Sequence, residues 1–189
     1  MQSATFALHG VVERVRTGDV GAFALIYEEY ASRIHSHAYR LLGNRHDADD
    51  VTQETFLRAF RSISRLADEE RIGSWLFAIA SNICLDTLRR RRIISWLPLT
   101  KGHEDIPDPR GDLSGTVAES ELVRQALAKL SLKDALCLVL RDVEGFSCQE
   151  IGEITGFSQP SIWTRLSRAR TKFAAAYAAL SPGSGEANR

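Results

Sequence analysis

The sequence lacks the features that mark membrane, secreted and catalytic proteins. Its 189 residues contain no run of about eighteen apolar residues, which excludes a transmembrane helix and insertion into a membrane. The opening segment, MQSATFALHGVVERVR, has neither a basic leader nor a long apolar stretch, so we expect no signal peptide and a cytoplasmic location. A glycine-rich phosphate loop and a nucleophile–base pair are both missing, so we expect neither enzyme activity nor catalytic residues.

Cysteine is also scarce, and its arrangement argues against disulfides and metal sites. The three cysteines, Cys84, Cys137 and Cys148, are odd in number and fall in predicted helices, which is typical of free thiols in a reducing cytoplasm. None belongs to a CxxC pair, and His35 and His37 are two residues apart, on different faces of a helix. The sequence therefore predicts no metal ion and no cofactor.

Net charge is absent too, because 24 basic residues balance 24 acidic ones. The charges are nevertheless separated along the chain. Residues 89–92 are four consecutive arginines, and residues 158–173 hold four basic residues and no acid. The acids gather instead at 47–54, 68–70 and 104–112. Because local potential decides where a phosphate backbone docks, the two basic segments are candidate nucleic-acid contacts.

Strand patterns are missing as well, so the sequence predicts an all-α fold. Apolar residues recur at the helical period almost throughout, and no alternating segment of useful length occurs. A polar segment at 64–73 is expected to form a loop. The expected helices cover residues 19–42, 47–63, 74–92, 118–130 and 132–143, followed by two short helices within 147–173.

Proline, glycine and acidic residues divide the chain into two domains. Residues 96–116 hold three of the five prolines, which is typical of a flexible linker. Whether its acids imitate nucleic acid in a basic channel or merely keep a spacer soluble is open. We expect small helical domains at 15–95 and 117–180, with an N-terminal extension at 1–14 and a disordered tail at 181–189.

The most informative segment is SCQEIGEITGFSQPSIWTRLSRARTKF, residues 147–173, which predicts two helices joined by a tight turn. Ser147 and Glu150 fit a capping box at the start of the first helix. Gly156 stands where that helix must end, since glycine accepts a left-handed backbone. Ser158 is a candidate cap for the second helix, and Pro160 is tolerated in its first turn.

The second of these helices has an apolar side and a polar side. Ile162, Leu166, Ala169 and Phe173 recur at helical spacing and form the expected buried stripe. Short polar groups followed by arginines suit a DNA major groove, although a small three-helix domain with a solvated basic face is the alternative. The candidate DNA-contacting residues are Ser158, Gln159, Ser161, Thr164, Arg165, Arg168 and Lys172.

The helix expected at 47–63 has a second face besides the one that packs inward. Val51, Thr55, Ala59, Phe60 and Ile63 form the inward face. The other face combines acids with an exposed leucine, which suits docking of a basic partner helix, but the residues alone favour an ordinary solvated surface. Its members are Asp50, Gln53, Glu54, Leu57 and Arg61.

The helix expected at 74–92 also separates apolar from polar residues. Ile72, Trp75, Leu76, Ile79 and Ile83 form its expected buried side. An asparagine can read a base edge and arginines can hold phosphates, although a basic last turn also offsets the helix dipole. The expected outward residues are Ser74, Ala78, Ser81, Asn82, Asp86, Arg89 and Arg90.

Three segments occur in one order: DADDVTQETFLRAF at 47–60, SWLFAIASNICLDTLRRRR at 74–92, and the helix-turn-helix. Together they resemble the sigma-70 family of initiation factors, in its short extracytoplasmic-function (ECF) branch. The resemblance covers nearly the whole chain apart from the first dozen residues, the linker and the tail. It implies that 15–95 corresponds to region 2 and 117–180 to region 4. The implied partners are core RNA polymerase, through its largest-subunit clamp and its flap, promoter DNA, and an anti-sigma factor.

The resemblance also assigns roles to individual residues. Polymerase binding by the D-x-x-D-V-x-Q-E segment falls on Asp47, Asp50, Gln53, Glu54, Leu57 and Arg58. Binding of the minus-ten promoter element falls on Arg65, Arg71, Trp75, Ser81, Asn82, Asp86, Arg89 and Arg90. Binding of the minus-thirty-five element falls on the seven outward residues of the last helix named above.

Two departures from the family pattern stand out. The segment KLSLKDA, at 129–135, replaces the usual leucine-proline turn, and Trp163 stands where a lysine is common. The tryptophan has three possible roles: packing under the helix, stacking on a sugar or touching a thymine methyl. The rival function is a stand-alone helix-turn-helix regulator that binds an operator without polymerase, and the acidic face at 50–54 distinguishes the two.

Overall fold

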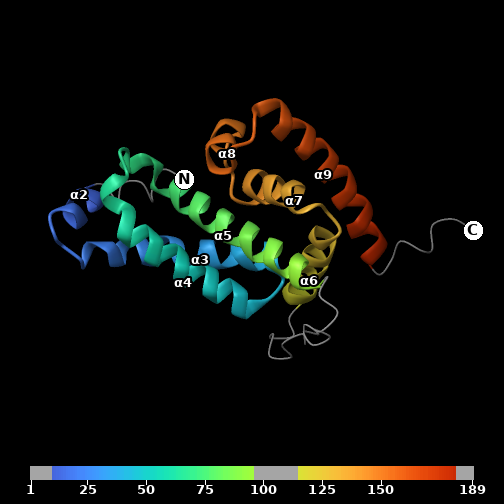
Figure 1. Ribbon diagram of the computed structural model, residues 1–189. Helices are drawn as coiled ribbons and strands as arrows, with labels where there is room; N and C mark the ends of the chain where they lie inside the picture. Colours follow the sequence, from blue (N-terminus) through green and yellow to red (C-terminus); the bar gives the residue numbers. More distant parts are fainter. Residues whose placement is uncertain (1–9, 96–114, 182–189) are drawn as a thin grey trace, which may run out of the picture. The chain divides into compact units, whose positions relative to one another are not determined.

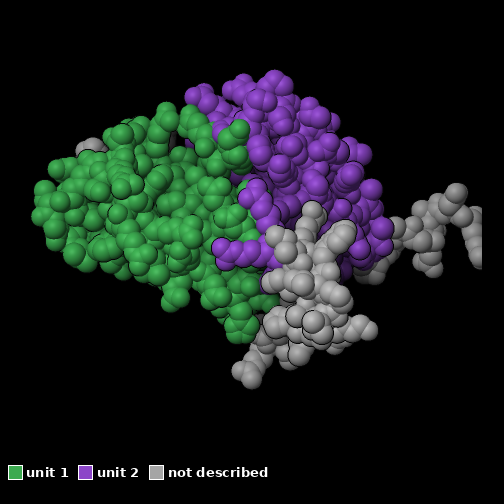
Figure 2. Space-filling view, in the orientation of Figure 1, with its two compact units in different colours: residues 1–87, 153–156 green, residues 88–152, 157–189 purple. Residues whose placement is uncertain are grey.

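The computed structural model describes residues 10–95 and 115–181, and it is helical within those ranges (Figure 1). The all-α prediction is therefore confirmed. The chain divides into two compact units, residues 1–87 with 153–156 and residues 88–152 with 157–189, which Figure 2 shows in different colours. No helix in the described ranges is both long and apolar enough to cross a bilayer. The predicted linker and tail fall almost entirely outside the described residues.

The first unit is built on a hairpin of long helices, α3 (Ala22–Leu42) and α4 (Arg45–Ser62), which pack along each other (Figure 1). Gly43 ends α3 with a left-handed backbone, φ 72°, which glycine accepts at little cost. Asn44 then caps α4, because its side-chain oxygen accepts a hydrogen bond of 3.1 Å from the backbone of Asp47. A short helix that the sequence pattern did not predict, α2 (Val11–Arg16), precedes the hairpin and buries Val11 and Val12.

The buried stripes of the hairpin follow the predicted period with small shifts. In α3, Ile26, Tyr30, Ile34, Ala38 and Leu42 are buried at helical spacing, whereas Leu41 is half-buried. In α4, Phe56 is buried, while Phe60 is 42% exposed although it was predicted to face inward. Phe23 of α3 is half-buried and meets both rings edge-on, with centroids 6.4 and 5.1 Å away. An aromatic cluster thus closes one end of the hairpin.

The chain between α4 and α5 is partly ordered into turns. The predicted loop at 64–73 contains two 3-10 turns, η1 (Ile63–Arg65) and η2 (Glu69–Arg71), and α5 (Ile72–Ser95) begins before the loop was expected to end. Gly73 lies in the first turn of α5, where a Cβ would sit 3.1 Å from the hydroxyl oxygen of Tyr30. Glycine therefore permits a close approach of α5 to α3.

The predicted buried side of α5 is partly wrong. Ile72 and Leu76 are buried, but Trp75, Ile79 and Ile83 are only half-buried. The buried side is instead rotated toward Phe77, Ala80 and Cys84, so that large and small residues share it. The helix is buried along Ile72, Leu76, Phe77, Ala80, Ser81, Cys84 and Leu85.

The rotation of the buried side of α5 makes the prediction for Ser81 wrong. It was expected among the outward, minus-ten-binding residues, but it is 1% exposed. Its hydroxyl oxygen lies 3.2 Å from Nε2 of His37, which is itself fully buried in α3. The physical reason is that a buried imidazole needs a polar partner, and Ser81 is the residue of α5 that supplies it.

The remaining helices lie in the second unit, except that the last residues of α8 (153–155) are grouped with the first. These are α6 (Gly115–Ala128), α7 (Leu132–Leu138), the π-helical turn η3 (Val139–Val143), α8 (Cys148–Thr155) and α9 (Gln159–Leu180). The single helix expected at 132–143 is therefore α7 with a widened last turn. Both α6 and α7 pack against α9. The core consists mainly of Leu136, Leu140, Ile151, Ile162 and Leu166, all almost fully buried.

The cysteines are free thiols, as the sequence predicts, and two of them are deeply buried. Burial raises the pKa of Cys84 to about 12 and that of Cys137 to about 11. Both thiols are therefore protonated at neutral pH and behave as small apolar side chains.

The buried histidine predicts a pH-dependent stability of the first unit. Burial, assisted by the charge of Arg40, lowers the pKa of His37 to about 3 from its ordinary value of 6.5. Below pH 6.5 the unfolded chain therefore binds a proton that the folded chain excludes. The stability is fully present above pH 6.5 and falls by about 1.4 kcal/mol per pH unit as the pH drops toward 3.

Urea unfolding of the full chain between pH 7 and pH 5 measures this dependence. His37→Gln should flatten the pH profile, whereas His46→Gln, at an exposed position of α4, should leave it as in the wild type. Identical pH slopes in the wild type and the His37 variant would contradict the assignment.

Candidate nucleic-acid interface

The helix-turn-helix forms as its local sequence predicts. The backbone nitrogen of Ser147 donates to a carboxylate oxygen of Glu150 at 2.7 Å, and the backbone of Glu150 donates to the Ser147 hydroxyl at 3.2 Å. This reciprocal pair is a complete capping box. Gly156 adopts φ 73° and ends α8. Ser158 occupies the cap position of α9 with an extended backbone, but its side chain makes no capping hydrogen bond, which corrects that detail of the prediction.

Burial fixes which side of α9 faces outward. Ile162, Leu166 and Ala169 are buried as predicted, and Phe173 is half-buried. Gln159, Thr164 and Lys172 are exposed, and Ser161 is half-buried. Trp163 is 60% exposed, so the structure excludes packing under the helix as its role. The outward side therefore offers an amide, hydroxyls and a bare indole for contact with a ligand.

The arginines of α9 are held by acids of the same unit. Asp134, in the first turn of α7, accepts hydrogen bonds from both Arg165 and Arg168. Arg170 pairs in the same way with Asp142, at 2.6 and 3.0 Å. The helix that looked uniformly basic in the sequence therefore carries three arginines that are ion-paired.

On α4, the acidic face predicted to bind polymerase is largely exposed. Asp50 and Gln53 are exposed, and Leu57 leaves 47% of its surface uncovered. Glu54 accepts a 2.6 Å hydrogen bond from Nε of Arg58, one helical turn away. This ion pair orients both side chains along the outer surface of α4, next to Leu57.

On α5, most residues predicted to bind the minus-ten element lie at the surface, apart from the buried Ser81. Asn82, Asp86, Arg89 and Arg90 are exposed, and Trp75 is half-buried. Arg65 and Arg71, from the turns before α5, are also exposed. The structure thus places an amide, an acid and arginines along one helix, which an arginine-bearing loop directly precedes in the chain.

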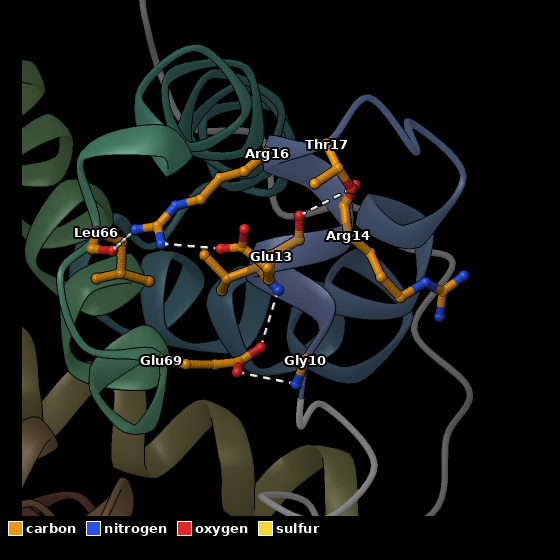
Figure 3. Close-up of polar contacts among 8 residues, drawn as sticks. Gly10, Glu13, Arg14, Arg16, Thr17, Leu66 and Glu69 are labelled. Atoms are coloured by element: carbon orange, nitrogen blue, oxygen red, sulfur yellow. Dashed lines mark hydrogen bonds and ion pairs between the residues drawn. The ribbon is translucent and has the colours of Figure 1, made fainter.

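A brace that sequence reasoning missed holds this loop (Figure 3). The carboxylate of Glu69 accepts hydrogen bonds from the backbone nitrogens of Gly10, at 2.9 Å, and Val12, at 2.8 Å. Arg16, at the other end of α2, donates to the carbonyl oxygen of Leu66. The segment that carries Arg65 and Arg71 is therefore tied at two points to α2. No short-range signal predicts contacts that join residues fifty or more positions apart.

Two family models match this chain, one over the helices α3 to α5 and one over the helix-turn-helix segment. A family model described as Sigma-70 region 2 matches residues 26–93, and one described as Sigma-70, region 4 matches residues 120–173. The chain belongs to the sigma-70 family. The first match contains the acidic face of α4 and the polar face of α5, and the second contains α7, α8 and the basic part of α9.

Individual relatives narrow the assignment to the ECF branch. The chain is 31% identical to the ECF RNA polymerase sigma factor SigW of Bacillus subtilis over 170 residues, which are 84% of this chain and 90% of that protein. It is 35% identical to the ECF RNA polymerase sigma factor SigE of Mycolicibacterium smegmatis, over 82% of this chain but only 62% of the relative. This protein is thus an ECF sigma factor by family, and it spans less than two thirds of some of its relatives.

Solved structures share the fold. CnrH, in its complex with the cytosolic domain of CnrY, matches with a TM-score of 0.69 and 25% identity, covering 90% of this chain and 97% of CnrH. The sigma factor RpoE from Bartonella quintana, in complex with the anti-sigma factor NepR, matches with a TM-score of 0.67 and 22% identity, over 83% and 97% of the two chains. The second likeness concerns the fold alone.

The Glu69 brace predicts a stability effect that is confined to the loop and α2. Glu69→Gln removes a charged acceptor of two backbone hydrogen bonds, so we expect a loss of about 1 to 3 kcal/mol in the unfolding free energy. Glu70→Gln, at the exposed neighbouring position, is the matched control. Hydrogen exchange on the full chain should show faster exchange of the amides at 10–12 and 63–71 in the Glu69 variant only. Equal behaviour of the two variants would contradict the brace.

Proposed function

We propose that this sigma-70 family member binds core RNA polymerase and directs it to promoters by recognising minus-ten and minus-thirty-five elements and by assisting strand opening. The observation that carries the proposal is the coexistence, in one chain, of an exposed acid-and-leucine face on α4 and an exposed polar side on the α9 recognition helix. A stand-alone operator-binding regulator needs the second surface but not the first. The protein acts in the cytoplasm, together with polymerase.

The polymerase contact in this proposal is α4. The largest-subunit clamp receives Asp50, Gln53 and Leu57, flanked by the Glu54–Arg58 pair, whose geometry is set by a 2.6 Å hydrogen bond. A central exposed leucine rimmed by charged and amide groups has the composition of a protein interface. Asp47 is half-buried at the capped start of α4, so its contribution is smaller than that of the residues further along the helix. Region 4 contacts the flap in this proposal.

The two promoter contacts lie in two parts of the chain, α5 with the loop before it and the α9 helix. Asn82, Asp86 and Arg89 of α5, with the braced loop, read and open the minus-ten element, where a separated base needs hydrogen-bonding and stacking partners. The outward side of α9 enters the major groove of the minus-thirty-five element. Because each unit offers a small surface, we expect the free protein to bind promoters weakly and to become specific as holoenzyme.

An anti-sigma factor is the proposed regulator. CnrH, at 25% identity, is bound in its solved structure to the cytosolic domain of another protein. The surfaces on α4 and α9 that contact polymerase and DNA are the ones that such a partner must cover to silence the protein.

The deciding experiment is in vitro transcription with core polymerase on a random promoter library. Enrichment of two separated elements at a fixed spacing supports the proposal. Failure of the purified chain to join core polymerase, or to direct any start site, contradicts it.

The polymerase contact predicts the effect of a charge reversal on α4. Glu54→Lys places a second cation beside Arg58 and removes an acid from the docking face, so affinity for core polymerase should fall by about tenfold or more. The control is Glu28→Lys, which makes the same charge change at an exposed position of α3. Binding to labelled core polymerase by fluorescence anisotropy measures the difference, and unchanged affinity for Glu54→Lys would favour the stand-alone regulator.

The division of promoter contacts predicts separable changes in selectivity. Asn82→Ala should relax the minus-ten preference and slow strand opening, while Gln159→Ala should relax the minus-thirty-five preference alone, each by about 1 to 3 kcal/mol at the base that it reads. Holoenzymes with each variant, selected on the same library, give the two profiles. Loss of both preferences in either variant would show that the units do not read separate elements.

A further inference from the structure

The segment KLSLKDA, where the chain departs from the family pattern, builds an unusual start for α7. Ser131 takes the cap position, and its hydroxyl oxygen accepts a hydrogen bond of 3.3 Å from the backbone of Asp134. A serine cap thus replaces the leucine-proline turn. The cap also fixes the first turn of α7, and with it the position of Asp134.

Asp134 is a buried carboxylate, 1% exposed, which is rare unless a partner compensates the charge. Arg168 compensates it with two hydrogen bonds, from Nε at 2.9 Å and from Nη2 at 2.6 Å. Arg165 adds a third, from Nη1 at 3.2 Å, and its guanidinium also lies 4.8 Å from the ring centroid of Phe157. A bidentate arginine–carboxylate pair fixes direction as well as distance.

The charge of the carboxylate persists despite its burial. Burial alone would raise the pKa of Asp134, but the hydrogen bonds from Arg168 and Ser131 outweigh it and hold the pKa below its ordinary value. The same contact raises the pKa of Arg168. At neutral pH the cluster of Asp134, Arg165 and Arg168 is therefore fully charged, with one negative and two positive groups and a net charge of +1.

The two arginines differ in what they still show to solvent. The side chain of Arg165 is 21% exposed, so most of it is used inside the unit. That of Arg168 is 46% exposed while it remains bound to Asp134. A DNA phosphate or base can thus reach Arg168 without breaking the internal pair, whereas Arg165 serves mainly to hold Phe157 and Asp134.

We propose that Asp134 is a positioning residue of the recognition helix, which fixes Arg168 and Arg165 on α9 and so lowers non-specific DNA binding while raising selectivity for the minus-thirty-five element. The inference rests on the proposed function of α9. A mobile arginine side chain can reach many phosphate positions on DNA and so binds any sequence. An arginine fixed by a bidentate pair contacts DNA in one register only. An internal carboxylate also cancels part of the attraction to the phosphate backbone.

Asp134→Asn tests the proposal, because the amide has the same shape but no charge. The control is Asp142→Asn, which makes the same charge change beside Arg170, where both side chains are more exposed. Each full-length variant is titrated, over a series of salt concentrations, against a random-sequence duplex and against a duplex that carries the minus-thirty-five element selected by wild-type holoenzyme. Circular dichroism checks that each variant is folded.

The selectivity ratio, affinity for the selected duplex over affinity for the random one, decides the outcome. Both variants should bind the random duplex more tightly, with a salt dependence steeper by about one phosphate contact. Asp134→Asn should also lower the selectivity ratio by about tenfold, whereas Asp142→Asn should leave it unchanged. Equal selectivity ratios in the two folded variants would overturn the proposal.

A measurement on the wild type covers the case in which Asp134→Asn does not fold. The Nε–H proton of Arg168 should exchange slowly with water in the NMR spectrum and should stay protected after the selected duplex is added. Rapid exchange in the free protein, or loss of protection on DNA binding, would overturn the proposal. If the wild-type library yields no minus-thirty-five element, the proposed function of α9 fails instead. A protected Arg168 proton would then show that the Asp134–Arg168 pair exists but has no role in selecting that element.

Discussion

Ile162, Leu166 and Ala169 bury one side of α9, which packs on α6 and α7, and this burial sets the rotation of the helix about its own axis. Each large side chain in such a stripe contributes about 1.5 to 3 kcal/mol, more than a surface ion pair or a single hydrogen bond does. The orientation of the apolar stripe therefore determines which way the polar side chains of α9 point. Gln159, Thr164 and Trp163 point outward because the opposite side is committed to the core.

Buried apolar stripes set the orientation of the helices, and polar contacts then fix individual side chains and loops. In the second unit, Asp134 holds two arginines of the recognition helix from a capped turn of α7. In the first unit, Glu69 holds the loop before α5 against the start of α2. In each case a carboxylate fixes side chains or backbone of a segment that the apolar stripe alone does not orient. Such segments would otherwise sample many conformations at the cost of binding selectivity.

The net charge of the chain is zero, and in the structure several basic residues are paired with acids close by. Arg165, Arg168 and Arg170 are matched by Asp134 and Asp142 within one unit, and Arg58 is matched by Glu54 within one helix. Local pairing reduces the long-range attraction to phosphate that a bare basic helix would have. In the proposed function, polymerase brings the protein to DNA, so the helix needs no strong phosphate attraction of its own, and the pairing would limit its binding to random DNA.

The sequence by itself determined the all-α fold, the helix-turn-helix and most helix ends. Ser147 with Glu150, Gly43 and Gly156 act on neighbours within a few residues, so their capping and turn roles can be derived from local order. The same holds for the apolar stripe of α9 and for the surface positions of Asp50 and Asn82. Only the tertiary structure decided that Ser81 is buried against His37, that Glu69 braces α2 and that Asp134 binds Arg168. Those partners are 44, 57 to 59 and 34 positions apart, and a periodic pattern has no information about which distant polar group a buried one will meet.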